Sequence, residues 1–174
     1  HKYSHLLPKG FIVMFAGNIG EAQDFPSIID AAVLTKHYDD IHWVILGKGS
    51  KETWVKNQIK SRGLNSTFHL LGKFPLNDMP DFYISADAML VSLKKQEISA
   101  LTVPAKVQSY LACGMPILSM LDGEGSRIVQ KARAGLTCPA ERADLLANNV
   151  IRLYNMPKIH IETMAANSLK YYKK

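Results

Sequence analysis

The sequence predicts an α/β fold, in which a parallel β-sheet lies between two layers of helices. Short, continuous apolar runs alternate with longer segments of helical periodicity, a pattern typical of buried parallel strands joined by helices. This unit repeats six times along 174 residues, a length that suits one domain with one hydrophobic core. The composition, 47% hydrophobic and 21% charged, is that of a globular protein.

The elements follow one another in order along the chain. The apolar runs predict strands at residues 11–16, 43–46, 68–71, 88–93, 116–120 and 136–138. Proline in a first turn or glycine beyond a last turn marks several helix ends. The first predicted helix has Pro26 in its first turn, and its apolar face is Ile28, Ile29, Ala32 and Val33. Further helices are predicted at residues 51–62, 78–85, 104–113, about 126–133, 142–154 and from 158 onwards. Because ligands of such folds bind outside the carboxyl ends of the strands, the first four strand-to-helix loops are the expected functional region.

Composition and charge limit the kinds of ligand, cellular compartment and membrane association that the protein is expected to have. The net charge of +6 permits an anionic ligand, although ordinary solvated lysines explain most of it equally well, and no nucleic-acid partner is expected. Cys113 and Cys138 lack the spacing of a metal site or a disulfide framework, which favours a cytoplasmic compartment. No apolar run reaches the roughly 20 residues of a membrane span. The missing initiator methionine and the polar residues 1–10 indicate a fragment of a longer protein.

Glycines mark the first three loops. In the first, residues 17–23, Gly17 and Gly20 would let the backbone approach a phosphate, or serve only the turn itself. In the second, residues 47–50, Lys48 would face a diphosphate or simply be solvated. In the third, residues 72–75, Phe74 would lie against a flat base or pin the loop onto the core.

The fourth loop, residues 94–103, is longer than a usual strand-to-helix connection, and such length often accompanies binding. It ends at a helix that begins with Pro104, and the N-terminus of that helix would direct backbone donors at an anion. Lys106 in the first turn opposes the helix dipole. Contact with a phosphate would offset the unfavourable interaction of the lysine with the dipole. Alternatively, Lys106 is exposed to solvent and binds nothing.

The run PAKVQSYLACGMP at residues 104–116 resembles the donor-site helix of family 4 (group 1) glycosyltransferases, with the pattern P-x-K-x-x-x-Y-L-A-x-G-x-P. Such enzymes build O-antigen, capsule and colanic-acid polysaccharides. AGNIGEAQDF and VILGKGSKE resemble the first two donor-domain loops of the family, and HLLGKF and the Ser-Ala-Asp-Ala of residues 85–88 follow in order. The resemblance covers nearly the whole chain.

The resemblance implies that residues 1–174 form one Rossmann-like nucleotide-sugar-binding domain, the C-terminal half of a glycosyltransferase-B fold. The enzyme would be retaining and metal-independent, without a cofactor, and would move a sugar from a nucleotide diphosphate, with UDP expected, to a lipid-linked or saccharide acceptor. An N-terminal domain, absent here, would hold the acceptor, so the fragment is expected to be inactive alone. Lys48 and Lys106 would stabilise the leaving diphosphate. The other expected binding residues are Gly17, Asn18, Ile19, Gly20, Gly47, Lys73, Phe74, Val103, Pro104, Ala105 and Ser109.

The chain departs from the family pattern at several charged positions. Asn18 stands where many members have arginine, and Gln23 or Asp24 lies near the position of a lysine. Leu101 and Ser109 replace two glutamates, and Ser109 would bind ribose more weakly than a carboxylate. Glu97, the only acid in the fourth loop, has no assigned role. These departures are interpreted as variation within the polysaccharide branch.

Two other functions compete with this interpretation. A sugar-nucleotide epimerase of the same architecture would need acidic residues and an arginine facing the sugar, and a non-catalytic nucleotide-binding module would need clustered acids at the strand ends. Asp39, Asp40 and Asp87 lie at the wrong ends of their strands. The six histidines lack a metal-site spacing, and His42 and His69 are expected to pack in the core or at an edge.

The last helix, from about residue 158, would pack on the missing domain or on a membrane. Its basic end, residues 170–174, would touch anionic lipid at the inner face of the plasma membrane, or remain a solvated tail.

Overall fold

The structure is a computed structural model that describes residues 2–96 and 100–174. The strands are β1 (Phe11–Ala16), β2 (Ile41–Leu46), β3 (Phe68–Gly72), β4 (Ala88–Ser92), β5 (Ile117–Met120) and β6 (Gly135–Cys138). The helices are α1 (Phe25–Thr35), α2 (Glu52–Ser61), α3 (Met79–Tyr83), α5 (Ala105–Ala112), α6 (Glu124–Ala132), α7 (Ala143–Asn155) and α8 (Lys158–Tyr172). Three short 3-10 turns, η1 (Ser4–Leu6), η2 (Glu21–Gln23) and η3 (Leu76–Asp78), complete the described elements.

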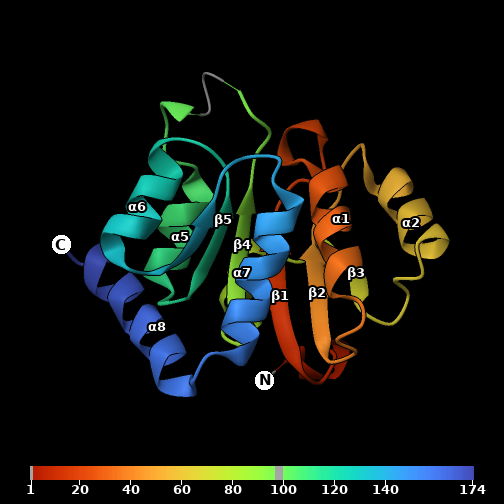
Figure 1. Ribbon diagram of the computed structural model, residues 1–174. Coiled ribbons are helices and arrows are strands. Elements are labelled where there is room, and N and C mark those ends of the chain that lie inside the picture. Colours follow the sequence, from red (N-terminus) through yellow and green to blue (C-terminus); the bar gives the residue numbers. More distant parts are fainter. Residues whose placement is uncertain (1, 97–99) are drawn as a thin grey trace.

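All six strands pair in parallel in the order β3-β2-β1-β4-β5-β6, which confirms the predicted α/β class (Figure 1). Between β1 and β4 the strand order reverses, and a sheet of this kind binds its ligands in the crevice at that point. The loops that follow the strands lie along the upper edge of the sheet in Figure 1. The topology therefore gathers the first, second and fourth loops around β1.

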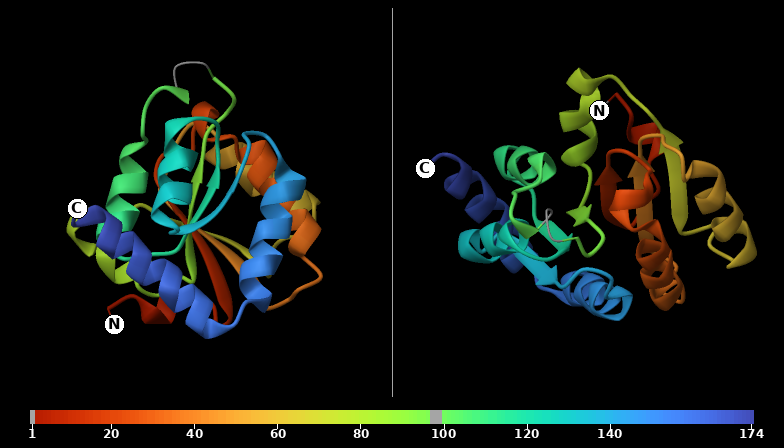
Figure 2. Two further views of the ribbon diagram at one scale, coloured as in Figure 1. Left: turned by 60° about the vertical axis from the view of Figure 1, so that its left-hand side comes forward. Right: turned by 90° about the horizontal axis from the view of Figure 1, so that it is seen from above.

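Helices cover both faces of the sheet, so that the fold has three layers (Figure 2). Side chains of α1, α2 and α7 pack on one face and those of α3, α5 and α6 on the other, forming two hydrophobic clusters. Successive strand residues supply them in turn, because side chains alternate between the faces of a strand. On β2, fully buried Trp43 belongs to the first cluster and fully buried Val44 to the second.

Several element boundaries differ from the predictions by one to three residues. β2 begins at Ile41, because Ile41 pairs with Phe11 and Gly10 leaves room beside His42. α6 begins at Glu124, directly after Gly123, whose φ of 89° permits the sharp entry from β5. These boundaries depend on strand pairing and on local backbone conformation, which hydrophobic periodicity does not reveal.

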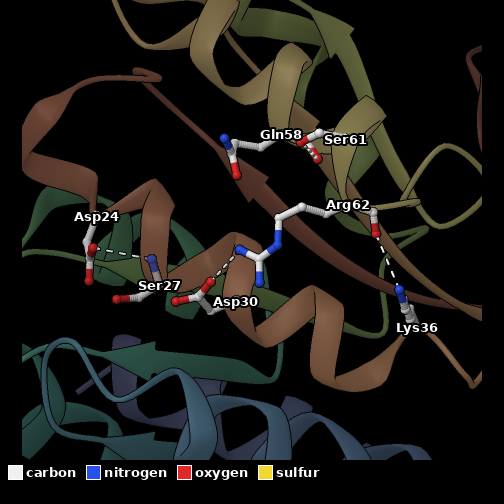
Figure 3. A network of polar contacts seen from close by, with 7 residues as sticks. All are labelled: Asp24, Ser27, Asp30, Lys36, Gln58, Ser61 and Arg62. Carbon is white, nitrogen blue, oxygen red and sulfur yellow. Dashed lines mark hydrogen bonds and ion pairs between the residues drawn. The ribbon is translucent and has the colours of Figure 1, made fainter.

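Polar contacts fix α1 at its start and fasten it to α2 (Figure 3). Asp24, at a φ of 56°, accepts the Ser27 N–H at 3.4 Å and so caps α1. Arg62 at the end of α2 forms an ion pair with Asp30 at 2.5 Å, while its carbonyl oxygen accepts from Lys36 Nζ at 3.4 Å. These surface contacts set the position of α2, and thereby of the loop that precedes it.

His42 on β2 and His69 on β3 form a pair on the face of the sheet that α3 covers. His42 Nδ1 and His69 Nε2 lie 2.9 Å apart, and burial together with the neighbouring His42 lowers the pKa of His69. Because an imidazolium has no acceptor nitrogen, this hydrogen bond requires at least one neutral ring.

The C-terminal helix α8 packs against α5 and α6 of this same domain. Buried Ser168 donates to the carbonyl oxygen of Met115 at 2.6 Å, and Asn167 donates to that of Arg133 at 3.0 Å. Ile159 and Tyr172 remain exposed on the helix. Across the described residues, no helix combines the length and apolar character needed to cross a bilayer.

Candidate functional site

Backbone hydrogen bonds join the first three loops at the carboxyl edge of the sheet. Gly17 N–H donates to Leu46, Ile19 N–H donates to Lys48, and Gly47 N–H donates to Gly72, each at 2.9 Å. The amides of Gly17 and Ile19 are therefore already bonded, although the sequence suggested that this loop would present its backbone to a phosphate. These hydrogen bonds instead fix the first loop beside the second loop.

Gly47 is the tightest point of this arrangement. Its φ is 145°, and a Cβ at this position would lie only 1.8 Å from the carbonyl oxygen of Gly17. Any side chain would push the first two loops apart, so the close approach depends on glycine.

Helix α5 brings a cation to the same edge. Pro104 occupies the N-cap position without a side-chain capping bond, and its carbonyl oxygen accepts the Val107 N–H at 3.0 Å. The helix is fixed to β1 by Tyr110, whose hydroxyl donates to the carbonyl oxygen of Ala16 at 3.3 Å. One turn earlier on the same face, Lys106 reaches over the first loop, where its Cε would lie 3.7 Å from a Cβ at Gly17.

A cavity of about 450 Å³ opens between these loops. It is lined by Gly17, Asn18, Leu46, Gly47, Lys48, Lys73, Phe74, Leu76, Met79 and Lys106. The structure thus brings Gly17, Lys48 and Lys106 together at one site, from three separate elements. Phe74, Leu76 and Met79 form an apolar wall at the end next to α3.

A smaller cavity of about 170 Å³ adjoins the larger one under the start of α5, and both share Gly17, Asn18 and Lys106. Its other lining residues are Phe15, Ala16, Gln23, Leu90, Val91, Ser92, Leu93, Pro104, Ala105 and Tyr110. Within the described part of the chain, the Ser92 hydroxyl and Gln23 Oε1 are buried without hydrogen-bond partners. A buried polar group without a partner typically costs about 1–3 kcal/mol, so this cavity calls for a polar occupant.

The electrostatics of the larger cavity favour an anion. Partial burial lowers the pKa of Lys106, which indicates that its ammonium has already lost part of its hydration. Lys48 is 64% exposed and lies 3.9 Å from Glu52, whereas among the described residues no aspartate or glutamate lines either cavity. Three lysines thus face the larger cavity without a lining carboxylate to neutralise them.

Four of the sequence-predicted residues lie outside both cavities. The Ile19 side chain is buried in the core, and Gly20 lines a separate surface pocket with Trp54. Val103 precedes the helix, away from the lining, and exposed Ser109 donates to the carbonyl oxygen of Ala105 within its own helix at 3.3 Å. The remaining predicted residues, which are Gly17, Asn18, Gly47, Lys48, Lys73, Phe74, Pro104, Ala105 and Lys106, line at least one cavity. Glu97 lies outside the described residues.

Sequence reasoning missed several lining residues. Leu76 and Met79 follow the third loop directly, but the 81% exposure that marks Leu76 as a contact surface is known only from the structure. Ser92 is the last residue of β4, where a polar side chain at the end of a buried strand marks the functional edge. Gln23 was noted only as a departure from the family pattern.

Two of the three aspartates that the sequence placed at the opposite edge have a structural role there. Asp87 accepts the Ile12 N–H at 2.8 Å, and Asp40 accepts the Tyr154 hydroxyl at 2.8 Å. Among the described residues, no group of three or more His, Cys, Asp or Glu side chains is placed to hold a metal ion.

Parallel-sheet topology, a cavity at the switch point and lysines around that cavity define a domain suited to a phosphate-bearing ligand. The family model described as Glycosyl transferases group 1 matches residues 10–156. The chain therefore belongs to the group 1 glycosyltransferases. A comparison with curated proteins gives no match.

Solved structures share the fold. The C-terminal domain of a group 1 family glycosyltransferase, LpcC from Francisella tularensis, aligns with a TM-score of 0.80 at 18% identity, covering 97% of this chain and 87% of that one. Anabaena HepE in complex with UDP and glucose gives 0.80 at 18% identity, over 95% of this chain and 44% of that one. The pneumococcal O-GlcNAc transferase GtfA in complex with UDP and GlcNAc gives 0.78 at 16% identity, over 98% and 33%. The chain thus has the fold of the C-terminal half of a glycosyltransferase-B protein, and spans a third to under a half of the two longer proteins.

Proposed function

We propose that this chain is the donor-binding domain of a retaining glycosyltransferase that moves a sugar from a nucleotide diphosphate, UDP in particular, to a lipid-linked or saccharide acceptor in cell-surface polysaccharide synthesis. The observation that carries the proposal is the cavity of about 450 Å³ at the switch point, into which Lys48, Lys73 and Lys106 project from three elements. Membership of the group 1 family and the UDP complexes of two similar structures support it.

In this proposal the diphosphate lies in the larger cavity, beside the first loop and Lys106 of α5. There the Lys106 ammonium would stabilise the charge that develops on the leaving diphosphate. Lys48 would contribute a weaker, screened charge from the opposite side. Because these groups are fixed before the ligand arrives, little of their stabilisation is lost to reorganisation during the reaction.

The nucleobase would occupy the apolar end of the cavity. Phe74 packs edge-on against Tyr3, with ring centroids 5.0 Å apart, which holds it in place from behind. Leu76 stands exposed at the mouth, where a flat base would cover it. Burial of this surface supplies affinity, while the lysines orient the phosphates.

The lining supports a transferase over an epimerase of the same architecture. An epimerase of this architecture would need acidic residues and an arginine at the sugar, whereas the described lining of both cavities contains no carboxylate or arginine. Such a lining can bind and polarise a donor. Transfer to an acceptor would need the opposing domain, so we expect this chain to bind nucleotide without catalysing transfer.

Isothermal titration with UDP, GDP and ADP tests the proposal. We expect UDP to bind with the highest affinity, and Lys106→Met to weaken that binding. Lys131→Met on α6, outside both cavities, serves as a control that should leave the affinity unchanged. Failure of all three nucleotides to bind the folded chain would refute the donor-domain assignment.

A cytoplasmic location with peripheral membrane contact is part of the same proposal. Exposed Lys170, Lys173 and Lys174 at the end of α8 would attract anionic lipid. Co-sedimentation with phosphatidylglycerol vesicles should exceed that with phosphatidylcholine vesicles, and equal sedimentation with both would exclude this contact.

A further inference from the structure

The smaller cavity contains two buried polar atoms, on Ser92 and Gln23, that are left unbonded by the part of the chain that the structure describes. Ser92, at the end of β4, is 2% exposed, and its hydroxyl lacks a partner among the described residues. Gln23 in η2 has its Oε1 buried without a donor. Both residues line this cavity, so one occupant can reach both side chains.

The two atoms define what the occupant must offer. Gln23 Oε1 is an acceptor and needs a donor, while the Ser92 hydroxyl has a hydrogen to give. A phosphate offers only acceptors, so it could accept from Ser92 but would leave Gln23 Oε1 without a donor. A single sugar hydroxyl can also donate to Gln23 Oε1 and accept from Ser92, but it carries no apolar group. An acetamido group offers one N–H, one carbonyl oxygen and a methyl group.

The remaining walls suit the rest of such a group. Phe15, Leu90, Val91 and Pro104 contribute apolar surface to the cavity. A methyl group next to the amide would pack there without an unmet hydrogen-bonding need. The volume of about 170 Å³ corresponds to five or six water molecules at about 30 Å³ each, which is room for an acetamido group and part of a ring.

We propose that the smaller cavity binds the acetamido group of a 2-acetamido sugar on the nucleotide donor, with its N–H donating to Gln23 Oε1 and its carbonyl accepting from Ser92. This inference rests on the proposed function, since the diphosphate must occupy the larger cavity. The two cavities share Gly17, Asn18 and Lys106, which places the sugar directly beyond the phosphates. Ser92 and Gln23 would thus determine donor specificity.

The test compares UDP, UDP-N-acetylglucosamine and UDP-glucose by isothermal titration against the 174-residue chain. Two additional neutral hydrogen bonds predict that the acetamido sugar binds about tenfold more tightly than glucose. Ser92→Ala and Gln23→Met should each reduce this preference to about threefold or less. Neither change should alter the affinity for UDP itself.

Thr67→Val is the matched control. Thr67 also has a buried hydroxyl without a partner among the described residues, but it lies at the amino edge of β3, outside both cavities. This variant should retain the tenfold preference, and thermal melting should show that all three variants fold.

The outcomes separate the two proposals. If UDP binds but the unmodified chain does not distinguish the two sugars, the acetamido assignment is overturned while the donor-domain function stands. The same holds if the preference survives in both Ser92→Ala and Gln23→Met, because the acetamido group is then recognised by other residues. If UDP does not bind, the proposed function fails and the sugar assignment fails with it.

Discussion

Replacement of Lys106 by methionine should weaken nucleotide binding and, at the same time, stabilise the free domain. The ammonium is partly buried in the first turn of α5, where the positive end of the helix dipole opposes it. Removal of the charge should therefore raise the free energy of unfolding by roughly 0.3–1 kcal/mol. A variant that merely damaged the fold would change stability in the other direction.

The binding loss can be worked from the position of the side chain. Two unit charges 4 Å apart interact by about 4 kcal/mol at an effective dielectric constant of about 20, an upper bound for this open cavity. A charge-assisted hydrogen bond has a net value of about 1.5–3 kcal/mol. Because the ammonium of Lys106 is already partly desolvated, most of that value should appear in binding. A loss of about 2 kcal/mol corresponds to a roughly 30-fold weaker Kd for UDP.

Titration calorimetry with UDP and urea denaturation of the same samples measure both effects. Lys48→Met is the comparison, because Lys48 is 64% exposed and lies 3.9 Å from Glu52. Its removal should cost less than about 1 kcal/mol, or about fivefold in Kd. Equal losses for the two lysines, or unchanged UDP binding by Lys106→Met, would refute the assignment of Lys106 as the principal cation.

Three further predictions concern the sheet and the loops. Burial and His42 lower the pKa of His69 below 6.5, so the unfolded chain binds a proton at a higher pH than the folded chain does. The free energy of unfolding should therefore decrease as the pH falls from about 7 to about 5. In urea titrations at several pH values, His69→Gln should make this decrease smaller. Gly47→Ala should destabilise the domain by about 2–4 kcal/mol and abolish UDP binding, since its Cβ would collide with Gly17; near-normal stability would show that the loops can separate freely. Leu76→Ala should leave the melting temperature unchanged but weaken UDP binding about fivefold, whereas an unchanged Kd would place the base elsewhere.

The sequence by itself determined the class of the fold and the edge at which the cavities lie. Continuous apolar runs such as residues 11–16 can be buried on both faces only in a covered parallel sheet, and right-handed crossovers then bring every strand-to-helix loop to one side. For this reason Gly17, Lys48 and Lys106, far apart in the chain, could be expected at one place without any knowledge of distances.

Only the tertiary structure decided which atoms at that edge are available to a ligand. The amides of Gly17 and Ile19 are bonded to the second loop, a matter of strand register that hydrophobic periodicity does not encode. The rotation of α5 about its axis brings Lys106 onto the cavities and leaves Ser109 in solvent, and this rotation is set by packing on the sheet. Likewise, the Ser92 hydroxyl is unbonded because no neighbour among residues 2–96 and 100–174 reaches it, and only the tertiary structure determines which side chains are neighbours.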